Sequence, residues 1–254
     1  MRVSDDAGRR TITIDRPEAK NALTIEMAAD LADAIEETTP ADHDVVVLEG
    51  AGDTFSAGGD VVAMADRGED VREEYERIAD SFGRIVEAAM TSPVPIVANV
   101  RGDAIGAGLS LVAVSDLAYA AENVRFSVAF VRVGLVPDTG GSVLLPHLIG
   151  LRETKRLALT GEFFDGEAAA EMGLVTETVA DEDLDDTVEA AVAALEEHPT
   201  RTLGMIKAAI HGGLGRDWRS ALEHENQVQA QARDTQAHVN ALEAFMSRRA
   251  GREE

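Results

Sequence analysis

Runs of apolar residues alternate with amphipathic segments through the first 180 residues of the chain. Residues 45–48 and 96–100 are apolar and rich in β-branched side chains, a pattern that predicts fully buried strands. Residues 11–14 alternate polar and apolar positions, which predicts a half-buried strand. Shorter strands are expected at residues 116–120, 124–127 and 174–179.

Helical patterns occupy the intervals between these strands. Thr24 is a candidate N-cap of a helix with apolar positions at Met27, Leu31 and Ile35. A long charged helix is expected over residues 69–90. Shorter helices are expected at residues 109–114, 143–148, 154–159 and 166–172.

After residue 184 the patterns predict helices alone, at about 184–197, 200–212 and 217–247, the last broken near Asp234. The chain therefore reads as an α/β protein followed by an all-helical end. We place the boundary between a core of residues 1–198 and a C-terminal helical region of residues 199–254.

Two glycine-rich loops each follow a buried strand and precede a helix: Gly58–Gly59 and Gly106–Ala107–Gly108. Glycine lets a backbone come close to a ligand, and a helix start presents unpaired N–H groups. Two such loops meeting at one point would form a hole for an oxyanion. Asp60, directly after the first loop, is expected to cap the segment that follows.

The composition narrows the classes of partner. The chain has 47 Asp and Glu against 23 Lys and Arg, a net charge of −24. Such a surface repels nucleic acid and anionic membranes, and we interpret it as adaptation to high intracellular salt. The chain has no cysteine and no apolar run long enough to span a membrane, so we expect a cytoplasmic protein without disulfides.

Common phosphate and metal motifs are missing. Leu111 stands where a dinucleotide fingerprint needs its third glycine, and no lysine follows a glycine as in a Walker A loop. The histidines are scattered and form no His-Glu-x-x-His motif. No metal site is expected.

Four segments together resemble the crotonase superfamily, the enoyl-CoA hydratase/isomerase group. Residues 14–23 (IDRPEAKNAL) resemble its N-terminal signature, and residues 50–60 (GAGDTFSAGGD) resemble its first oxyanion loop. Residues 93–116 are similar to its second oxyanion loop, and residues 134–141 (GLVPDTGG) to its substrate loop. All four in this order and spacing make a specific match.

The resemblance implies a crotonase-like spiral of ββα units with a C-terminal helical region that builds trimers or dimers of trimers. It implies acyl-CoA thioester substrates and no separate cofactor, since coenzyme A enters with the substrate. By position, the oxyanion N–H groups would come from Gly59 and Ala107, with Lys20 and Ala22 near the adenine of CoA. The residues implied in binding are Lys20, Ala22, Ala57, Gly58, Gly59, Asp60, Val61, Gly106, Ala107, Ser110, Phe130 and Pro137.

The chain departs from the family's hydratases at their two catalytic glutamates, whose positions hold Ser110 and Phe130. Asp138 is then the acid left on the substrate loop, and one carboxylate suffices to move a proton between two carbons. Double-bond isomerisation with Asp138 as proton shuttle is therefore the leading expectation. Alternatives are that Asp138 only caps a helix, that Asp138 and Ser110 hold a water for hydration, or that the chain binds acyl-CoA without turnover.

Overall fold

The computed structural model describes residues 1–65 and 70–250. Its larger sheet has six strands in the order β1-β2-β3-β5-β7-β10. Only the β1–β2 pair is antiparallel, and the remaining neighbours are parallel. The strands are β1 (Arg2–Asp6), β2 (Arg9–Ile14), β3 (Val45–Gly50), β5 (Ile96–Val100), β7 (Leu117–Ala121) and β10 (Glu177–Val179).

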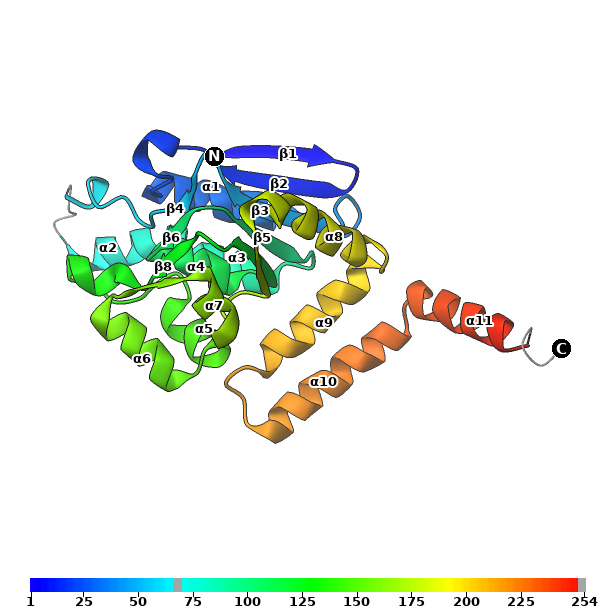
Figure 1. Ribbon diagram of the computed structural model, residues 1–254. Helices are drawn as coiled ribbons and strands as arrows, with labels where there is room; N and C mark the ends of the chain where they lie inside the picture. Colours follow the sequence, from blue (N-terminus) through cyan, green and yellow to red (C-terminus); the bar gives the residue numbers. More distant parts are fainter. Residues whose placement is uncertain (66–69, 251–254) are drawn as a thin grey trace.

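A second sheet has four short strands in the order β4-β6-β8-β9. They are β4 (Thr54–Ser56), β6 (Asp103–Ile105), β8 (Arg125–Ser127) and β9 (Phe163–Asp165). Each of β3, β5 and β7 in the large sheet is followed by a strand of the small sheet and then by helix. The chain thus repeats a strand–strand–helix unit, and successive units stack one after another along the two sheets (Figure 1).

The helices of the core lie close to their expected places. Thr24 caps the first one as predicted, because its hydroxyl oxygen accepts the N–H of Met27 at 3.2 Å. The long charged helix is observed as two helices joined by a π-helical turn over Ala79–Gly83, and Glu69 lies outside the described residues. The core helices are α1 (Ile25–Glu36), α2 (Val71–Ile78), α3 (Arg84–Thr91), α4 (Ala107–Val114), α5 (Gly141–Leu148), α6 (Leu151–Thr160) and α7 (Gly166–Met172).

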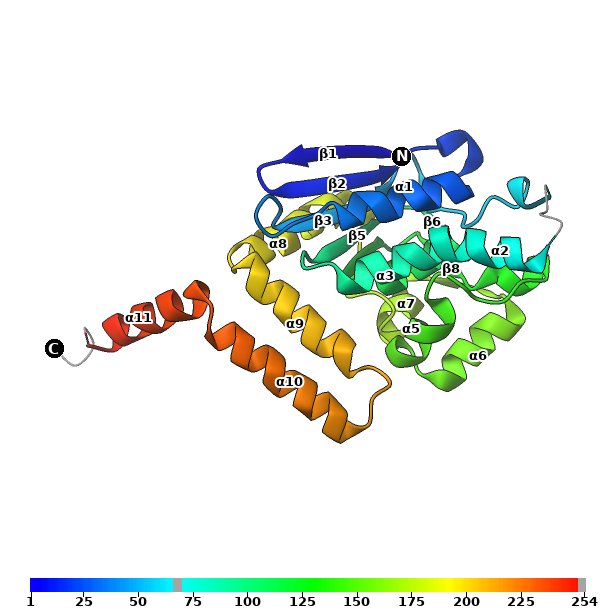
Figure 2. The same cartoon turned by 180° about the vertical axis from the view of Figure 1, so that it is seen from behind.

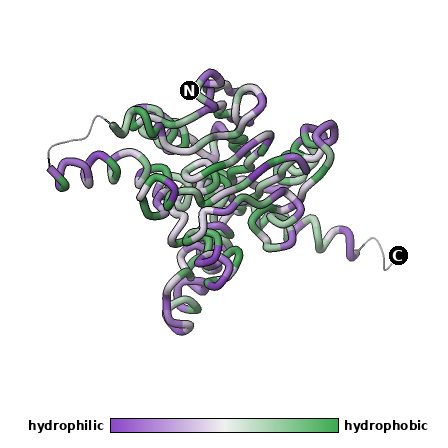
Figure 3. The backbone as a smooth tube through the Cα atoms, turned by 60° about the vertical axis from the view of Figure 1, so that its left-hand side comes forward, coloured by the Kyte–Doolittle hydropathy of each residue, from purple (hydrophilic) through white to green (hydrophobic). Residues whose placement is uncertain are grey.

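The hydrophobic core lies between the large sheet and the helices that cover it. The strands with continuous apolar runs, β3 and β5, are central in the sheet, and their apolar side chains are at most 5% exposed. Hydrophobic positions gather in the middle of the body, whereas hydrophilic positions lie toward the outside (Figure 3). Helix α4 is buried along its whole length, so its N-terminus is held firmly by packing.

The C-terminal helices are α8 (Leu184–Glu196), α9 (Thr200–Gly213), α10 (Trp218–Arg233) and α11 (Gln236–Ala250). The predicted break near Asp234 is confirmed. Helices α9 and α10 lie side by side, and α11 extends away from the body (Figures 1 and 2). Lys207 of α9, which is 6% exposed, binds Asp116 at the start of β7 with 2.6 Å between Nζ and Oδ2. The division into two domains stays a prediction.

The sequence patterns did not predict four of the observed strands, and they placed one further strand too early in the chain. β1 is exposed on every residue and has a single apolar side chain, Val3, so it lacks an apolar face. β4, β6 and β9 have three residues each, which is too short for a period to show. Residues 174–176 were wrongly expected to be strand; the chain bends there, and β10 begins at Glu177.

No helix among the described residues is both long and apolar enough to cross a bilayer.

Candidate active site

The two glycine-rich loops meet because the strands before them are neighbours. β4 and β6 pair in parallel, with Thr54 opposite Asp103 and Ser56 opposite Ala104. Parallel strands direct their carboxyl ends to the same edge of a sheet. The loops that leave this edge, at Gly58–Gly59 and Gly106–Gly108, therefore lie together as the sequence predicted.

The approach of the two loops is close enough to require glycine. Gly58 has φ of +91°, and a Cβ there would lie 2.6 Å from the carbonyl oxygen of Ile105 and 3.1 Å from the nitrogen of Ala107. A Cβ on Gly108 would lie 2.3 Å from the carbonyl oxygen of Ser56. Larger residues at either place would push the first loop away from helix α4.

Two N–H groups without a partner lie on these adjoining loops. Ala107 is the first residue of α4, where a helix leaves its N–H groups unsatisfied. Gly59 lies between two residues that bond to Leu23, through Leu23 N–H to Gly58 O at 2.7 Å and Asp60 N–H to Leu23 O at 2.8 Å. Among the described residues, nothing accepts a hydrogen bond from the N–H of Gly59 or Ala107. Such donors, held in place before a reaction, can stabilise an oxyanion.

A buried asparagine holds the first loop from below. Asn21 is fully buried, and its amide nitrogen donates to the carbonyl oxygens of Ala51 and Thr54 at 2.8 and 2.5 Å. The hydroxyl of Ser56 donates to the carbonyl oxygen of Asn21 at 2.8 Å and accepts the N–H of Gly58 at 3.1 Å. This chain of bonds fixes the backbone at the glycine pair.

Asp60 caps the turn after the loop, as predicted. Its Oδ1 accepts the N–H groups of Val62 and Ala63 at 3.0 and 3.1 Å. Its Oδ2 binds Arg16 at 2.5 Å. The Arg16 guanidinium, followed by the two backbone N–H groups, lowers the pKa of Asp60 below its usual range. Asp60 is therefore a structural anion that fixes the exit of the loop.

Asp138 lies on the loop before α5 and is tied to α4. The hydroxyl of Ser110, three residues after Ala107, donates to the backbone carbonyl oxygen of Asp138 at 3.1 Å. The Asp138 side chain is half-buried, and burial raises its pKa above the usual range. The hydrogen bond from Thr139 acts in the opposite direction but does not cancel this effect. A carboxylate in such an environment is suited to accept and return a proton.

The alternative reading of Asp138 as a helix cap is wrong. Helix α5 begins after Gly140, and no side chain caps it. The Asp138 carboxylate accepts instead from the hydroxyl of Thr139, with 2.9 Å from Oγ1 to Oδ1.

The remaining candidate binding residues differ in how deeply they are buried and in how close they lie to the two glycine loops. The Phe130 ring is 7% exposed, and its Cζ lies 4.0 Å from the place a Cβ on Gly106 would take. Pro137 and Ser110 both lie close to Gly141, since a Cβ on this glycine would lie 3.5 Å from the Pro137 Cβ and 2.8 Å from the Ser110 Oγ. Around the rim, Lys20 and Val61 are exposed, while Ala22 and Ala57 are half-buried. Asp103, at the start of β6, is bound by Arg125 and is not free for chemistry.

Several residues of the site gave little signal in the sequence. Arg16 and Asn21 belong to the N-terminal signature, but their bonds to the first loop depend on a fold that brings distant segments together. Met64 lies over the first loop, with its Cε 2.5 Å from the place of a Cβ on Gly59. Thr139 showed no pattern of its own. A polar residue beside a candidate acid is the one clue that could have directed attention to it.

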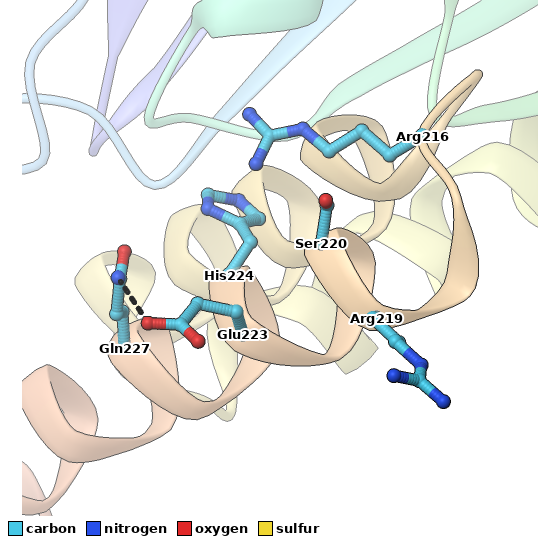
Figure 4. Close-up of a pocket in the computed structure, with 6 residues that line it drawn as sticks. All are labelled: Arg216, Arg219, Ser220, Glu223, His224 and Gln227. Atoms are coloured by element: carbon cyan, nitrogen blue, oxygen red, sulfur yellow. Dashed lines mark hydrogen bonds between the residues drawn. The ribbon is translucent and has the colours of Figure 1, made fainter.

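One hollow of the described surface lies elsewhere, on α10 and the loop before it (Figure 4). Its lining residues are Arg216, Arg219, Ser220, Glu223, His224 and Gln227. His224 contacts the carbonyl oxygen of Ala208 at 3.1 Å, which joins α10 to α9. The described residues contain no group of three or more His, Asp or Glu side chains that could hold a metal ion. Neither the glycine loops nor Asp138 lines this hollow.

Comparison with known proteins identifies the family of the chain. The family model for enoyl-CoA hydratase/isomerase matches residues 6–252. The chain is 32% identical to the 1,2-epoxyphenylacetyl-CoA isomerase of Escherichia coli K12, over 96% of this chain and 94% of the relative. An enoyl-CoA hydratase of Mycobacterium smegmatis superposes with a TM-score of 0.88 at 32% identity, covering 97% of this chain and 95% of that one.

A third protein, from Thermobifida fusca YX, was solved in complex with CoA and superposes with a TM-score of 0.82 at 29% identity, covering 91% of each chain. The expected spiral of ββα units with a helical C-terminal region is confirmed by these structures. The chain belongs to the enoyl-CoA hydratase/isomerase family.

Proposed function

We propose that this family member is an enoyl-CoA isomerase that moves a carbon–carbon double bond along an acyl-CoA thioester. The observation that carries the proposal is the environment of Asp138, a half-buried carboxylate with a raised pKa, tied to the helix that offers the Ala107 N–H. The two positions that hold glutamates in the family's hydratases carry Ser110 and Phe130. Neither side chain can act as a general base at neutral pH.

The reaction needs one base and one oxyanion site. Asp138 takes a proton from C2 of a 3-enoyl thioester, so the C2–H bond breaks and the carbonyl oxygen becomes an enolate oxygen. The N–H groups of Gly59 and Ala107 donate to this oxygen. Asp138 then gives the same proton to C4, the double bond forms between C2 and C3, and the enolate returns to a thioester. Because the proton is returned, Asp138 ends the cycle ionised.

The thioester lies between the first loop and the Phe130 side of the site. Lys20 is exposed and belongs to no ion pair among the described residues, so its ammonium is available to the phosphates of CoA. Asp60 holds the first loop, and Val61 is 54% exposed beside it. Apolar side chains here suit an acyl chain, and coenzyme A enters as part of the substrate.

The protein assembles as a trimer or a pair of trimers through its C-terminal helices. The support is a set of apolar side chains on these helices that are between 41% and 69% exposed in the single chain. They include Ile206, Ile210, Trp218, Leu222, Val239, Leu242, Phe245 and Met246. Sedimentation in molar KCl tests this part of the proposal; a monomer at micromolar concentration would contradict it.

Replacing Asp138 by Asn tests the function. Wild-type protein mixed with a 3-enoyl-CoA should produce the conjugated 2-enoyl absorbance. Asp138→Asn should lose this activity while it still binds the thioester, as measured by calorimetry. Asp103→Asn serves as the comparison, because Asp103 is a carboxylate of the second loop that is already paired with Arg125.

The other outcomes decide between classes of function. Full activity in Asp138→Asn would overturn the assignment of the base. If the wild type removes the conjugated absorbance of a 2-enoyl-CoA and does not isomerise a 3-enoyl-CoA, the protein is a hydratase. If the protein binds these thioesters but turns over neither the 3-enoyl-CoA nor the 2-enoyl-CoA, it is an acyl-CoA-binding protein.

A further inference from the structure

Thr139 has a backbone conformation that its side chain disfavours. Its φ is +49°, in the left-handed region, and it is a β-branched residue. β-branched residues are rare there, and such strain costs about 1–3 kcal/mol. Glycine would take this conformation without strain. The structure around Thr139 therefore has to offset the cost.

The Thr139 side chain is buried and points its hydroxyl at the candidate base. Thr139 is 4% exposed, and its Oγ1 donates to Oδ1 of Asp138 at 2.9 Å. Among residues 1–65 and 70–250, no other side chain donates to this carboxylate. A buried hydroxyl next to a carboxylate is worth more than a neutral hydrogen bond, because the acceptor is charged.

The backbone around Thr139 is fixed from both sides. Gly140 is also left-handed, with φ of +80°, and the N–H of Gly141 donates to the carbonyl oxygen of Asp138 at 2.8 Å. The Ser110 hydroxyl reaches the same oxygen. A Cβ on Gly141 would lie 2.8 Å from the Ser110 Oγ, so this contact requires glycine. The Asp138 carbonyl is thus bonded to α4, and among the described residues Thr139 alone donates a side-chain hydrogen bond to the Asp138 carboxylate.

We propose that Thr139 is a positioning residue that sets the orientation and charge of the Asp138 carboxylate. Its hydroxyl occupies Oδ1, so Oδ2 is the oxygen that takes the proton from substrate carbon and returns it. The same hydrogen bond favours the ionised form and keeps the base ready after each cycle. This inference rests on the proposed isomerase function.

Three substitutions of Thr139 distinguish the effect of its hydroxyl group from the effects of its β-branched shape and of its backbone strain. Thr139→Val keeps the β-branched shape and removes the hydroxyl. Thr139→Ser keeps the hydroxyl, and Thr139→Gly removes both the hydroxyl and the strain. Thr187→Val is the matched control, since Thr187 is half-buried on α8, outside the site, and its hydroxyl donates to a backbone oxygen one turn away.

We expect Thr139→Val and Thr139→Gly to lower kcat by about 10- to 100-fold, the range of one hydrogen bond to a charged group, with little change in KM. The acid limb of the pH–rate profile should move to higher pH in both. Thr139→Ser should retain kcat within about threefold and the wild-type profile, and Thr187→Val should match the wild type. A Thr139→Gly variant with wild-type kcat and pH profile would overturn the proposal.

A second readout does not depend on turnover. The side-chain carboxyl carbon of Asp138, identified by its loss in Asp138→Asn, can be titrated by NMR in 13C-aspartate-labelled protein. The pKa of Asp138 should rise in Thr139→Val and stay near the wild-type value in Thr139→Ser. An unchanged pKa in Thr139→Val would overturn the role of Thr139 even if the protein isomerises. A raised pKa in a protein that isomerises no enoyl-CoA would support the role of Thr139 and contradict the isomerase function.

Discussion

The hydroxyl of Ser110 donates a 3.1 Å hydrogen bond to the backbone carbonyl oxygen of Asp138. Ser110 lies one turn after Ala107 on α4, so one buried helix bears the proposed oxyanion donor and bonds to the backbone of the proposed base. The distance between the proposed donor and base is therefore set by a helical turn rather than by a flexible loop. In the family's hydratases a glutamate occupies this position; here the position supports the acid instead of supplying it.

Ser110→Ala should lower kcat by about fivefold and leave KM almost unchanged. The variant removes one of two donors to the Asp138 carbonyl, a loss of about 1 kcal/mol that acts on the position of the base. Steady-state kinetics with a 3-enoyl-CoA measures this. Ser115→Ala is the matched control at the C-cap of the same helix, since its hydroxyl donates to the Leu111 carbonyl oxygen and to no other described residue. Unchanged kcat in Ser110→Ala would mean that the Gly141 turn alone fixes Asp138.

Gly108→Ala should separate the two loops. The new Cβ would lie 2.3 Å from the Ser56 carbonyl oxygen, so β4 or α4 must shift. Displacing one oxyanion donor typically costs about 10²–10³ in kcat, and overpacking costs about 1–3 kcal/mol of stability. The control is Gly213→Ala, also in a helix, where the nearest atom is 4.0 Å away. A Gly108→Ala variant with wild-type kcat would contradict the convergence of the donors.

Asp138 should reduce stability at neutral pH. Its folded pKa is raised, so its protonated form adds stability below the unfolded value of 3.8. That contribution is lost as pH rises through the folded pKa. Asp138→Asn should therefore be at least as stable as the wild type at pH 7, with a flatter dependence on pH above 3.8. Urea unfolding at several pH values checks this; a less stable Asp138→Asn at pH 7 would contradict it.

Asp60 should show the opposite dependence on pH. Its folded pKa is lowered, first by Arg16, so its contribution is present above 3.8 and is lost as pH falls through the folded pKa. Asp60→Asn should lower the free energy of unfolding at pH 7 by about 1–3 kcal/mol, and the difference from wild type should narrow in acid. Asp70→Asn is the control, because Asp70 caps α2 at an exposed site and no described arginine side chain binds it. Equal losses in both variants would show that Arg16 adds nothing.

Salt should stabilise the whole protein. A net charge of −24 makes the folded chain repel itself, and molar salt shortens the screening length to about 3 Å. We expect the Tm to rise between 0.1 M and 3 M KCl. Calorimetry in both media measures this, and an equal Tm would contradict adaptation to high salt.

The sequence by itself determined the central strands of the large sheet, most of the helices and the glycine loops. Apolar runs such as residues 45–48 and 96–100 are long enough for their burial to show in the pattern. Thr24 and Asp60 act through neighbours two or three residues away, so their capping roles could be predicted locally. The resemblance of four ordered motifs to one family pointed to Asp138 as the candidate acid and to Ser110 and Phe130 at the two glutamate positions of the family's hydratases.

Only the tertiary structure decided how these parts meet. The small sheet is built from three-residue strands that have no period, yet pairing of β4 with β6 is what joins the two glycine loops. The bond from Ser110 to Asp138 crosses 28 residues of sequence, and the bond from Arg16 to Asp60 crosses 44. The role of Thr139 depends on a left-handed backbone and on burial, which come from long-range packing. Local sequence cannot encode these contacts, because each forms between segments that the fold alone brings together.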